Sequence, residues 1–248
     1  MSVHDALTGS LEQLAKALEP AVFEPRDGYV FLSFPSFPIP FLNGMWAHDD
    51  SAAVHIEDAR ADAERLGTPF TIMVLDSRTP AVEEAARGRG FAPAERMPGM
   101  LATHDSFRDE QVPGVEIAAI SNRNELDEAE VIVRDAFGLP ADWAAAVYAP
   151  EVVALEGVQF YLARVDGHAV ATAMGFTIGD AVGIFNVATP AEDRGHGYGG
   201  TVTARAVRDG FDRGARYAAL QSSAIGESVY RRLGFEQLET YVAFIPKS

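Results

Sequence analysis

The stretch Arg194-Gly195-His196-Gly197-Tyr198-Gly199-Gly200 decides how this chain is interpreted. It follows an apolar run at 182–187 and precedes a segment with helical spacing at 201–213. A strand, a glycine loop and a helix in this order predict an anion site, because free backbone N–H groups and the positive end of the helix dipole converge there. Glycines let the backbone approach a phosphate closely, and Arg194 adds a planar charged donor. The stretch therefore predicts that the chain binds a phosphate-bearing cofactor.

The composition narrows the remaining function classes. The chain has 248 residues, of which 48% are hydrophobic and 23% charged, as is usual for a globular protein. It has no cysteine, which excludes disulfides, thiolate metal sites and cysteine nucleophiles. Its histidines lack the spacing of metal ligands, so no metal site is expected. The net charge of −16 argues against nucleic-acid binding; it would suit a cationic substrate, although solubility alone also accounts for it.

Membrane and export signals are absent from the sequence pattern. No apolar run approaches the roughly 18 residues that a membrane span needs. The first residues, Met1-Ser2-Val3-His4-Asp5, lack the basic start and apolar stretch of a signal peptide. We therefore expect no membrane association and a cytoplasmic location.

The periodicity of the chain predicts an α/β fold with a mixed, mostly antiparallel sheet flanked by helices. Helices are expected over residues 5–18, 56–66, 80–89, 123–137, 141–148, 201–213 and 227–233. Strands are expected over residues 29–34, 70–75, 97–103, 115–120, 159–164, 169–178, 181–187, 217–220 and 239–245. Asp166-Gly167 is typical of a hairpin turn between two of these strands.

The chain divides into two predicted units. Residues 104–114 are polar and end in Pro113-Gly114, so we interpret them as a linker between domains 1–103 and 115–248. Segments 67–91 and 214–235 both run from a glycine through a strand and a helix to Gly-Phe. Counted back from that pair, Ala86 takes the place of Tyr230. The first unit is thus predicted to be a degenerate copy of the second, unless the shared pattern is a chance recurrence.

A dinucleotide site is the first alternative for the glycine stretch. Gly195, Gly197 and Gly200 fit Gly-x-Gly-x-x-Gly, but that fingerprint needs a carboxylate about 20 residues later to hold a ribose. Residues 218–223 contain none, and the preceding strands look antiparallel. This weakens the hypothesis of a nucleotide-dependent oxidoreductase.

Three motifs resemble the GCN5-related N-acetyltransferase (GNAT) superfamily. The loop from Arg194 to Gly199 is similar to its pyrophosphate loop, Arg/Gln-x-x-Gly-x-Gly/Ala. Residues 185–190 resemble the strand before that loop, and residues 223–235 the later segment ending in Tyr-x-x-Leu-Gly-Phe. The resemblance covers residues 115–248 and implies an acyl-CoA N-acyltransferase fold in two tandem units.

The resemblance also implies a reaction and a cofactor. The chain would transfer an acetyl group from acetyl-CoA to a primary amine of a small molecule or an amino group. Main-chain groups of the strand end and the loop, with the side chain of Arg194, would hold the cofactor. The residues implied in binding are Val187, Ala188, Thr189, Arg194, Gly195, His196, Gly197, Tyr198, Gly199, Gly200 and Ser223.

Tyr230 is the predicted catalytic residue, because a phenol near the sulfur can protonate the departing thiolate. Relatives often carry a glutamate base on the strand at 184–187, where this chain has Asn186, so the base is open among groups such as Asp142, Glu151 and Glu156. The missing glutamate leaves a non-catalytic acyl-CoA-binding sensor as the alternative function. The sequence names neither the acceptor nor the oligomeric state, and it leaves a homodimer open.

Overall fold

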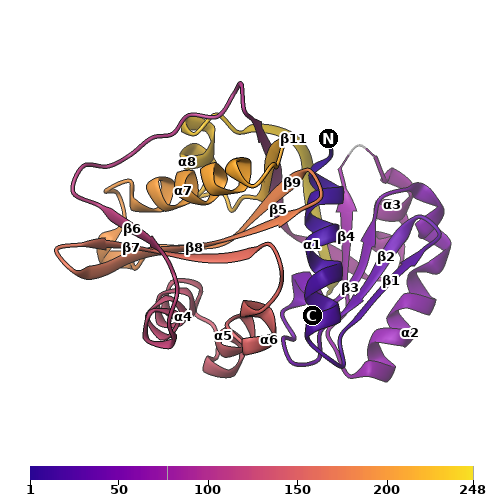
Figure 1. Ribbon diagram of the computed structural model, residues 1–248. Helices are drawn as coiled ribbons and strands as arrows, with labels where there is room; N and C mark the ends of the chain where they lie inside the picture. Colours follow the sequence, from indigo (N-terminus) through magenta and orange to yellow (C-terminus); the bar gives the residue numbers. More distant parts are fainter. Residues whose placement is uncertain (77, 248) are drawn as a thin grey trace. The chain divides into compact units, whose positions relative to one another are not determined.

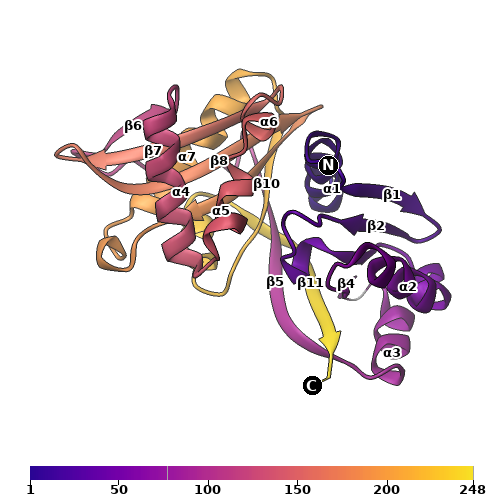
Figure 2. The same cartoon turned by 90° about the horizontal axis from the view of Figure 1, so that it is seen from below.

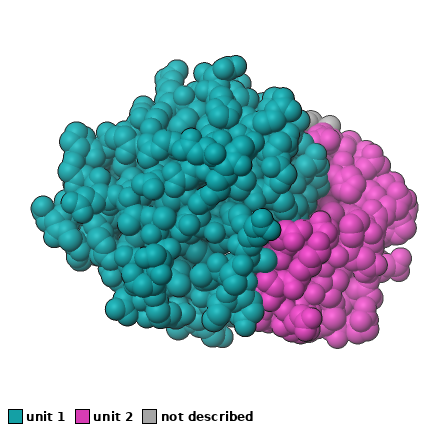
Figure 3. Space-filling model, viewed as in Figure 1, with its two compact units in different colours: residues 1–10, 100–238 teal, residues 11–99, 239–248 magenta. Residues whose placement is uncertain are grey.

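The computed structural model describes residues 1–76 and 78–247, and the chain divides into two compact units (Figure 3). Unit 1 comprises residues 1–10 and 100–238, and unit 2 comprises residues 11–99 and 239–248. The boundaries therefore differ from the predicted domains 1–103 and 115–248. The first ten residues belong to unit 1, although the residues that follow them form unit 2. The last strand pairs inside unit 2, although the residues before it belong to unit 1.

Unit 1 is built on a mostly antiparallel run of strands in the order β10-β9-β8-β7-β6 (Figure 1). Pairs β6–β7, β7–β8 and β8–β9 are antiparallel, and β9–β10 is parallel. The strands are β6 (Glu116–Ala119), β7 (Val158–Val165), β8 (His168–Ile178), β9 (Ala181–Ala188) and β10 (Tyr217–Gln221). This confirms the predicted mixed sheet and the hairpin at Asp166-Gly167.

Helices cover both faces of this sheet. Figures 1 and 2 show α7 on one face and α4, α5 and α6 on the other. The helices of unit 1 are α4 (Arg123–Phe137), α5 (Ala141–Val147), α6 (Pro150–Val153), α7 (Tyr198–Asp212) and α8 (Glu227–Arg232). Under α7 lies a core that includes Val182, Ile184, Val207 and Leu220. Burying such side chains stabilises the fold by about 1.5–3 kcal/mol each, and it fixes α7 against the strands that carry the glycine loop.

Residues 104–114 are irregular, as predicted, but they are not a linker between the units, because they lie wholly inside unit 1. Two hydrogen bonds fix their backbone: Arg108 N–H donates to the carbonyl of Leu233 at 3.0 Å, and Val112 N–H donates to Thr201 Oγ1 at 3.2 Å. We call residues 104–114 the strap. The polar composition that suggested a linker reflects an exposed course over the ends of α7 and α8.

Unit 2 repeats the arrangement of strands on a smaller scale. Its order is β1-β2-β3-β4-β11, with β3–β4 parallel and the other pairs antiparallel. The strands are β1 (Val22–Arg26), β2 (Tyr29–Ser33), β3 (Gly44–Ala47), β4 (Thr71–Leu75), β5 (Phe91–Thr103) and β11 (Glu236–Pro246), the last two continuing into unit 1. The helices are α2 (Ile56–Leu66), α3 (Pro80–Gly88) and the second half of α1 (Val3–Ala17), whose residues up to Ser10 belong to unit 1, with short 3-10 turns at Pro40–Leu42 and Asp50–His55. The repeated order is what a duplicated fold would give, and the duplication itself stays a prediction.

The strands that were not predicted from the sequence were hidden for local reasons. Pro25 obscures β1, and it is tolerated there because β1 is the edge strand of this order and needs no N–H from that residue. Pro93 and Pro98 hide the first half of β5, which begins at Phe91 rather than at residue 97. β3 is buried along its whole length and so lacks the alternation that marks a strand.

No helix within residues 1–76 and 78–247 is both long enough and apolar enough to cross a bilayer.

Candidate active site

The glycine loop ends in an uncapped helix N-terminus. Gly195 and Gly197 both have φ of +85°, a conformation that side chains disfavour, and α7 begins at Tyr198, three residues earlier than predicted. The first intrahelical bond runs from Thr201 N–H to the Gly197 carbonyl at 3.0 Å. Within the described part of the chain, the N–H groups of residues 195–200 have no hydrogen-bond acceptor. They form the free amide cluster that an anion at a helix N-terminus requires.

Two glycines of α7 allow this helix end to pack closely. A Cβ on Gly199 would lie 3.2 Å from Thr189 Oγ1 and 3.8 Å from Val187 Cγ1, at the end of β9. A Cβ on Gly200 would lie 3.3 Å from Val229 Cγ1, the neighbour of Tyr230 in α8. The amide cluster is thereby held between the end of β9 and the helix that carries the tyrosine.

The polar side chains of the loop support its backbone. Arg194 Nε donates to the Thr189 carbonyl at 3.2 Å, while its exposed guanidinium makes no ion pair among the residues described. His196 Nδ1 lies 3.2 Å from the Asp193 carbonyl, and its ring stacks on Tyr198 with the centroids 5.4 Å apart. These contacts agree with a structural role for His196, and they leave the other donors of Arg194 available to an anion.

β9 and β10 pair over only part of their length. The parallel ladder joins residues 181–183 to residues 217–219 and stops there, although β9 continues to Ala188. Next to this point Asn186 has φ of +51°, and the register with β8 shifts between Thr172 and Met174. Asparagine tolerates this left-handed conformation better than most residues. The bulge bends β9 and leaves the backbone of Ile184–Val187 unpaired on the β10 side, which is an edge that an extended ligand can join.

Tyr230 lies in α8, next to Val229, which packs on Gly200 at the start of α7. Its ring is 9% exposed and packs edge-on to Phe235 with the centroids 5.9 Å apart. Burial raises the pKa of Tyr230 to about 12, so the phenol stays protonated at neutral pH. Among the described residues its hydroxyl has no hydrogen-bond partner. A protonated, unengaged phenol is suited to donating a proton.

The turn before α8 is held by Ser223 and packs on the ring of Tyr230. Ser223 Oγ accepts a bond from Gly226 N–H at 3.2 Å, so its side chain stabilises the turn. A Cβ on Gly226 would lie 3.0 Å from Tyr230 Cε2. Glycine at this position lets the phenol ring lie flat against the turn, where an alanine would press on it.

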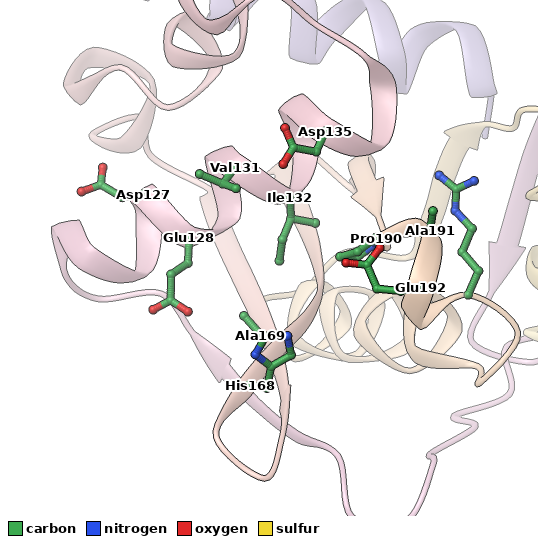
Figure 4. A pocket seen from close by; sticks show the side chains of 11 residues that line it. Asp127, Glu128, Val131, Ile132, Asp135, His168, Ala169, Pro190, Ala191 and Glu192 are labelled. Atoms are coloured by element: carbon green, nitrogen blue, oxygen red, sulfur yellow. The ribbon is translucent and has the colours of Figure 1, made fainter.

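A cavity of about 570 Å³ adjoins the loop on the α4 side (Figure 4). It is lined by Asp127, Glu128, Val131, Ile132, Asp135, His168, Ala169, Pro190, Ala191, Glu192 and Arg194. Three of its four carboxylates already pair with arginines, and Tyr230 is not in its wall. The cavity therefore does not join the loop to the tyrosine.

None of the three carboxylates considered as a base is distinguished by its surroundings. Asp142, Glu151 and Glu156 are exposed side chains without a contact that would single one out. Asn186 shapes β9 through its backbone and supplies no base. No group of three or more metal-ligating side chains occurs in the described ranges.

Comparisons with known proteins agree with this geometry. Residues 126–235 match the model of the acetyltransferase (GNAT) family, whose members use acetyl-CoA. A GCN5-related N-acetyltransferase from Kribbella flavida has a similar fold, with a TM-score of 0.76, 23% identity, and coverage of 98% of this chain and 96% of that one. A second from Sphaerobacter thermophilus gives a TM-score of 0.64 at 17% identity, covering 94% of this chain and 84% of that one.

A protein of unknown function from Staphylococcus epidermidis gives a TM-score of 0.68 at 13% identity, with coverage of 91% and 93%. No curated protein matches the sequence. Solved structures thus share the fold over both units, whereas the family match lies within unit 1.

Proposed function

Starting from a chain whose residues 126–235 form an acetyltransferase domain of the GNAT family, we propose that it transfers an acetyl group from acetyl-CoA to a primary amine of a small molecule or to an amino group. One observation carries the proposal. The parallel ladder of β9 and β10 ends at Gly183, and the helix turn that carries the free amides of residues 195–200 packs both on the end of β9 and on Val229, the neighbour of Tyr230.

The residues of the loop fit the diphosphate of coenzyme A. Free N–H groups at the α7 N-terminus offer up to six donors, and the helix dipole favours a negative charge there. The first turn of α7 contains no acidic residue that would repel it. Arg194, anchored through Nε, keeps its terminal nitrogens for a phosphate oxygen. The unpaired edge of β9 can exchange peptide-like hydrogen bonds with the pantetheine arm.

Acetyl-CoA, when bound, supplies an activated acetyl group and leaves as a thiol. The contribution of this chain to that step is a proton: Tyr230 can donate its phenolic hydrogen to the departing sulfur as the amine nitrogen forms its bond to the acetyl carbon. The amine must lose a proton, and the phenolate then regains one. Because asparagine at position 186 cannot act as a base, we propose that the amine enters unprotonated or that water takes its proton.

Calorimetry with coenzyme A and a thiol-release assay with a panel of amines test the proposal together. We expect coenzyme A to bind and at least one amine to accelerate the release of thiol from acetyl-CoA. Failure to bind coenzyme A overturns the proposal. Binding without amine-dependent release across the panel favours the second candidate, a non-catalytic acyl-CoA sensor, which the absence of a carboxylate at Asn186 supports.

A further inference from the structure

Gln221 is the last residue of β10, two positions beyond the end of its ladder with β9. Ala218 and Leu220 pack into the core under α7. Tyr217 points the other way, since its hydroxyl donates to the Ser2 carbonyl at 3.4 Å. Side chains alternate along a strand, so Gln221 points to the same face as Tyr217, away from α7. That face carries α4, α5 and α6 (Figures 1 and 2).

The amide nitrogen of Gln221 is buried, and no residue in the described ranges accepts a hydrogen bond from it. An unpaired buried donor costs about 1–3 kcal/mol, which natural sequences usually avoid by using an apolar side chain. Gln159, on β7 of the same sheet, shows the ordinary arrangement: its Nε2 donates to the Phe160 carbonyl at 2.9 Å and to the Ile120 carbonyl at 3.3 Å. Gln221 therefore does not serve the fold in the way that Gln159 does.

We propose that Gln221 is a substrate-binding residue whose amide donates a hydrogen bond to an oxygen held where β9 and β10 separate. This inference rests on the proposed acetyltransferase function. The oxygen belongs either to the thioester carbonyl or to the acceptor, and both present the same hydrogen-bond-accepting chemistry. No covalent step is assigned to Gln221, because a carboxamide neither gives up nor takes a proton at neutral pH.

The test compares Gln221→Met with Gln159→Met in the full-length chain. Methionine keeps the length of the side chain and removes the donor. Gln221→Met should raise the melting temperature by about 2–4 °C, because the unpaired donor disappears. It should also lower amine-dependent thiol release about tenfold, the usual effect of losing one hydrogen bond. Gln159→Met should lower the melting temperature and leave thiol release unchanged.

Two further measurements identify the oxygen. If it is the thioester carbonyl, Gln221→Met also slows the hydrolysis of acetyl-CoA in the absence of amine. If it belongs to the acceptor, hydrolysis is unchanged and the KM of the most active amine of the panel rises. The affinity for coenzyme A, measured by calorimetry, should equal that of the parent chain in both cases.

Each result decides the matter. Slower thiol release with a melting temperature that is raised or unchanged supports the inference. Unchanged thiol release, or slower release together with a lowered melting temperature, overturns it and makes Gln221 a structural residue. A parent chain that does not bind coenzyme A overturns the proposed function, whereas an unaffected Gln221→Met variant of an active parent overturns only the role of Gln221.

Discussion

β9 and β10 in unit 1 and β3 and β4 in unit 2 are both parallel pairs that follow an antiparallel run, yet they end differently. β3 pairs with β4 from Gly44 to Trp46, nearly to the end of the strand. A Cβ on Gly44 would lie 2.1 Å from the Thr71 carbonyl oxygen, so glycine allows the two strands to close tightly. β9 pairs with β10 over its first three residues only, and then bends at Asn186. The β3–β4 pair in unit 2 is closed, and the β9–β10 pair in unit 1 is open.

The helices after these strands differ in the same direction. In unit 2, Asp49 caps the 3-10 turn Asp50–His55 that leads into α2 by accepting the N–H of Ser51, and Asp50 in that turn accepts the N–H of Ala81 in α3. Glu57 and Asp58 add negative charge to the first turn of α2. In unit 1 the corresponding helix, α7, has glycines and free amides. Unit 2 thus places negative charge, which repels anions, at the start of α2, while unit 1 leaves the N–H groups at the start of α7 for a ligand.

The site in unit 1 is therefore defined by the backbone groups that the fold leaves without hydrogen-bond partners.

Replacing Tyr230 with phenylalanine should make unit 1 resemble unit 2, where Ala86 holds the matching place. We expect turnover to fall about 100-fold, because a general acid is lost, while coenzyme A still binds. Steady-state thiol release and calorimetry measure the two effects. Tyr148→Phe is the matched control, since this buried tyrosine donates to the Ala129 carbonyl at 3.3 Å and lies outside the site. Unchanged turnover in Tyr230→Phe would remove the catalytic assignment.

Gly197→Ala tests the amide cluster. The left-handed φ of +85° and a distance of 3.0 Å from the new Cβ to Val112 Cγ2 should distort the start of α7. A strain of about 1–3 kcal/mol corresponds to roughly tenfold weaker binding of coenzyme A in calorimetry.

Gly67→Ala in unit 2 carries a similar backbone cost, with φ of +69° and no atom within 4 Å of the new Cβ. It should lower the melting temperature and leave the affinity for coenzyme A unchanged. Equal affinities in both alanine variants would contradict a role for the loop.

Val112→Ala tests whether the strap positions the glycine loop. Val112 packs on Gly197, and its N–H donates to Thr201 in the first turn of α7. Losing the side-chain contact should raise the KM for acetyl-CoA about threefold, which is about 0.6 kcal/mol, and leave kcat unchanged. Val54→Ala, at a residue of unit 2 that is 75% exposed, is the control. A strap that only fills space would change the melting temperature without changing the KM.

The pH dependence should carry the smallest signal. Because the pKa of Tyr230 lies near 12, the pH profile of kcat should show no decline from this group between pH 7 and 10. A decline that Tyr230→Phe abolishes would contradict the burial of the phenol.

Burial also raises the pKa of Tyr161 to about 12. A folded-state pKa above the unfolded value of about 10 gives stability that is complete below pH 10 and is lost as the pH rises through 12. Chemical denaturation at pH 9 and 11 should therefore show weaker folding at the higher pH. The loss of stability between pH 9 and 11 should be smaller in Tyr230→Phe, because that variant lacks one of the two tyrosines whose pKa is raised by burial.

Much of the site could be predicted because its chemistry is local. Gly195 and Gly197 adopt positive φ within a few residues of one another, and the start of α7 follows from them. The Tyr-x-x-Leu-Gly-Phe motif likewise places Tyr230 on a short helix that ends in a left-handed glycine. The helices at 56–66 and 123–137 were correct to the residue, because each has a strong apolar periodicity and a glycine just beyond its end.

The rest depended on pairings between distant segments, which no local pattern encodes. In the sequence, Asn186 is notable only because relatives often carry a glutamate on this strand. Only the register between β8, β9 and β10 shows that it lies where the strand bends. The strap looked like a linker until its bonds to Leu233 and Thr201 were seen. Gln221 has no local signal at all, since an unpaired donor is recognised only when every neighbour is in place. Short-range sterics therefore determined the loop and the tyrosine, whereas long-range burial and strand pairing decided where the sheet opens and which buried polar group is left unpaired.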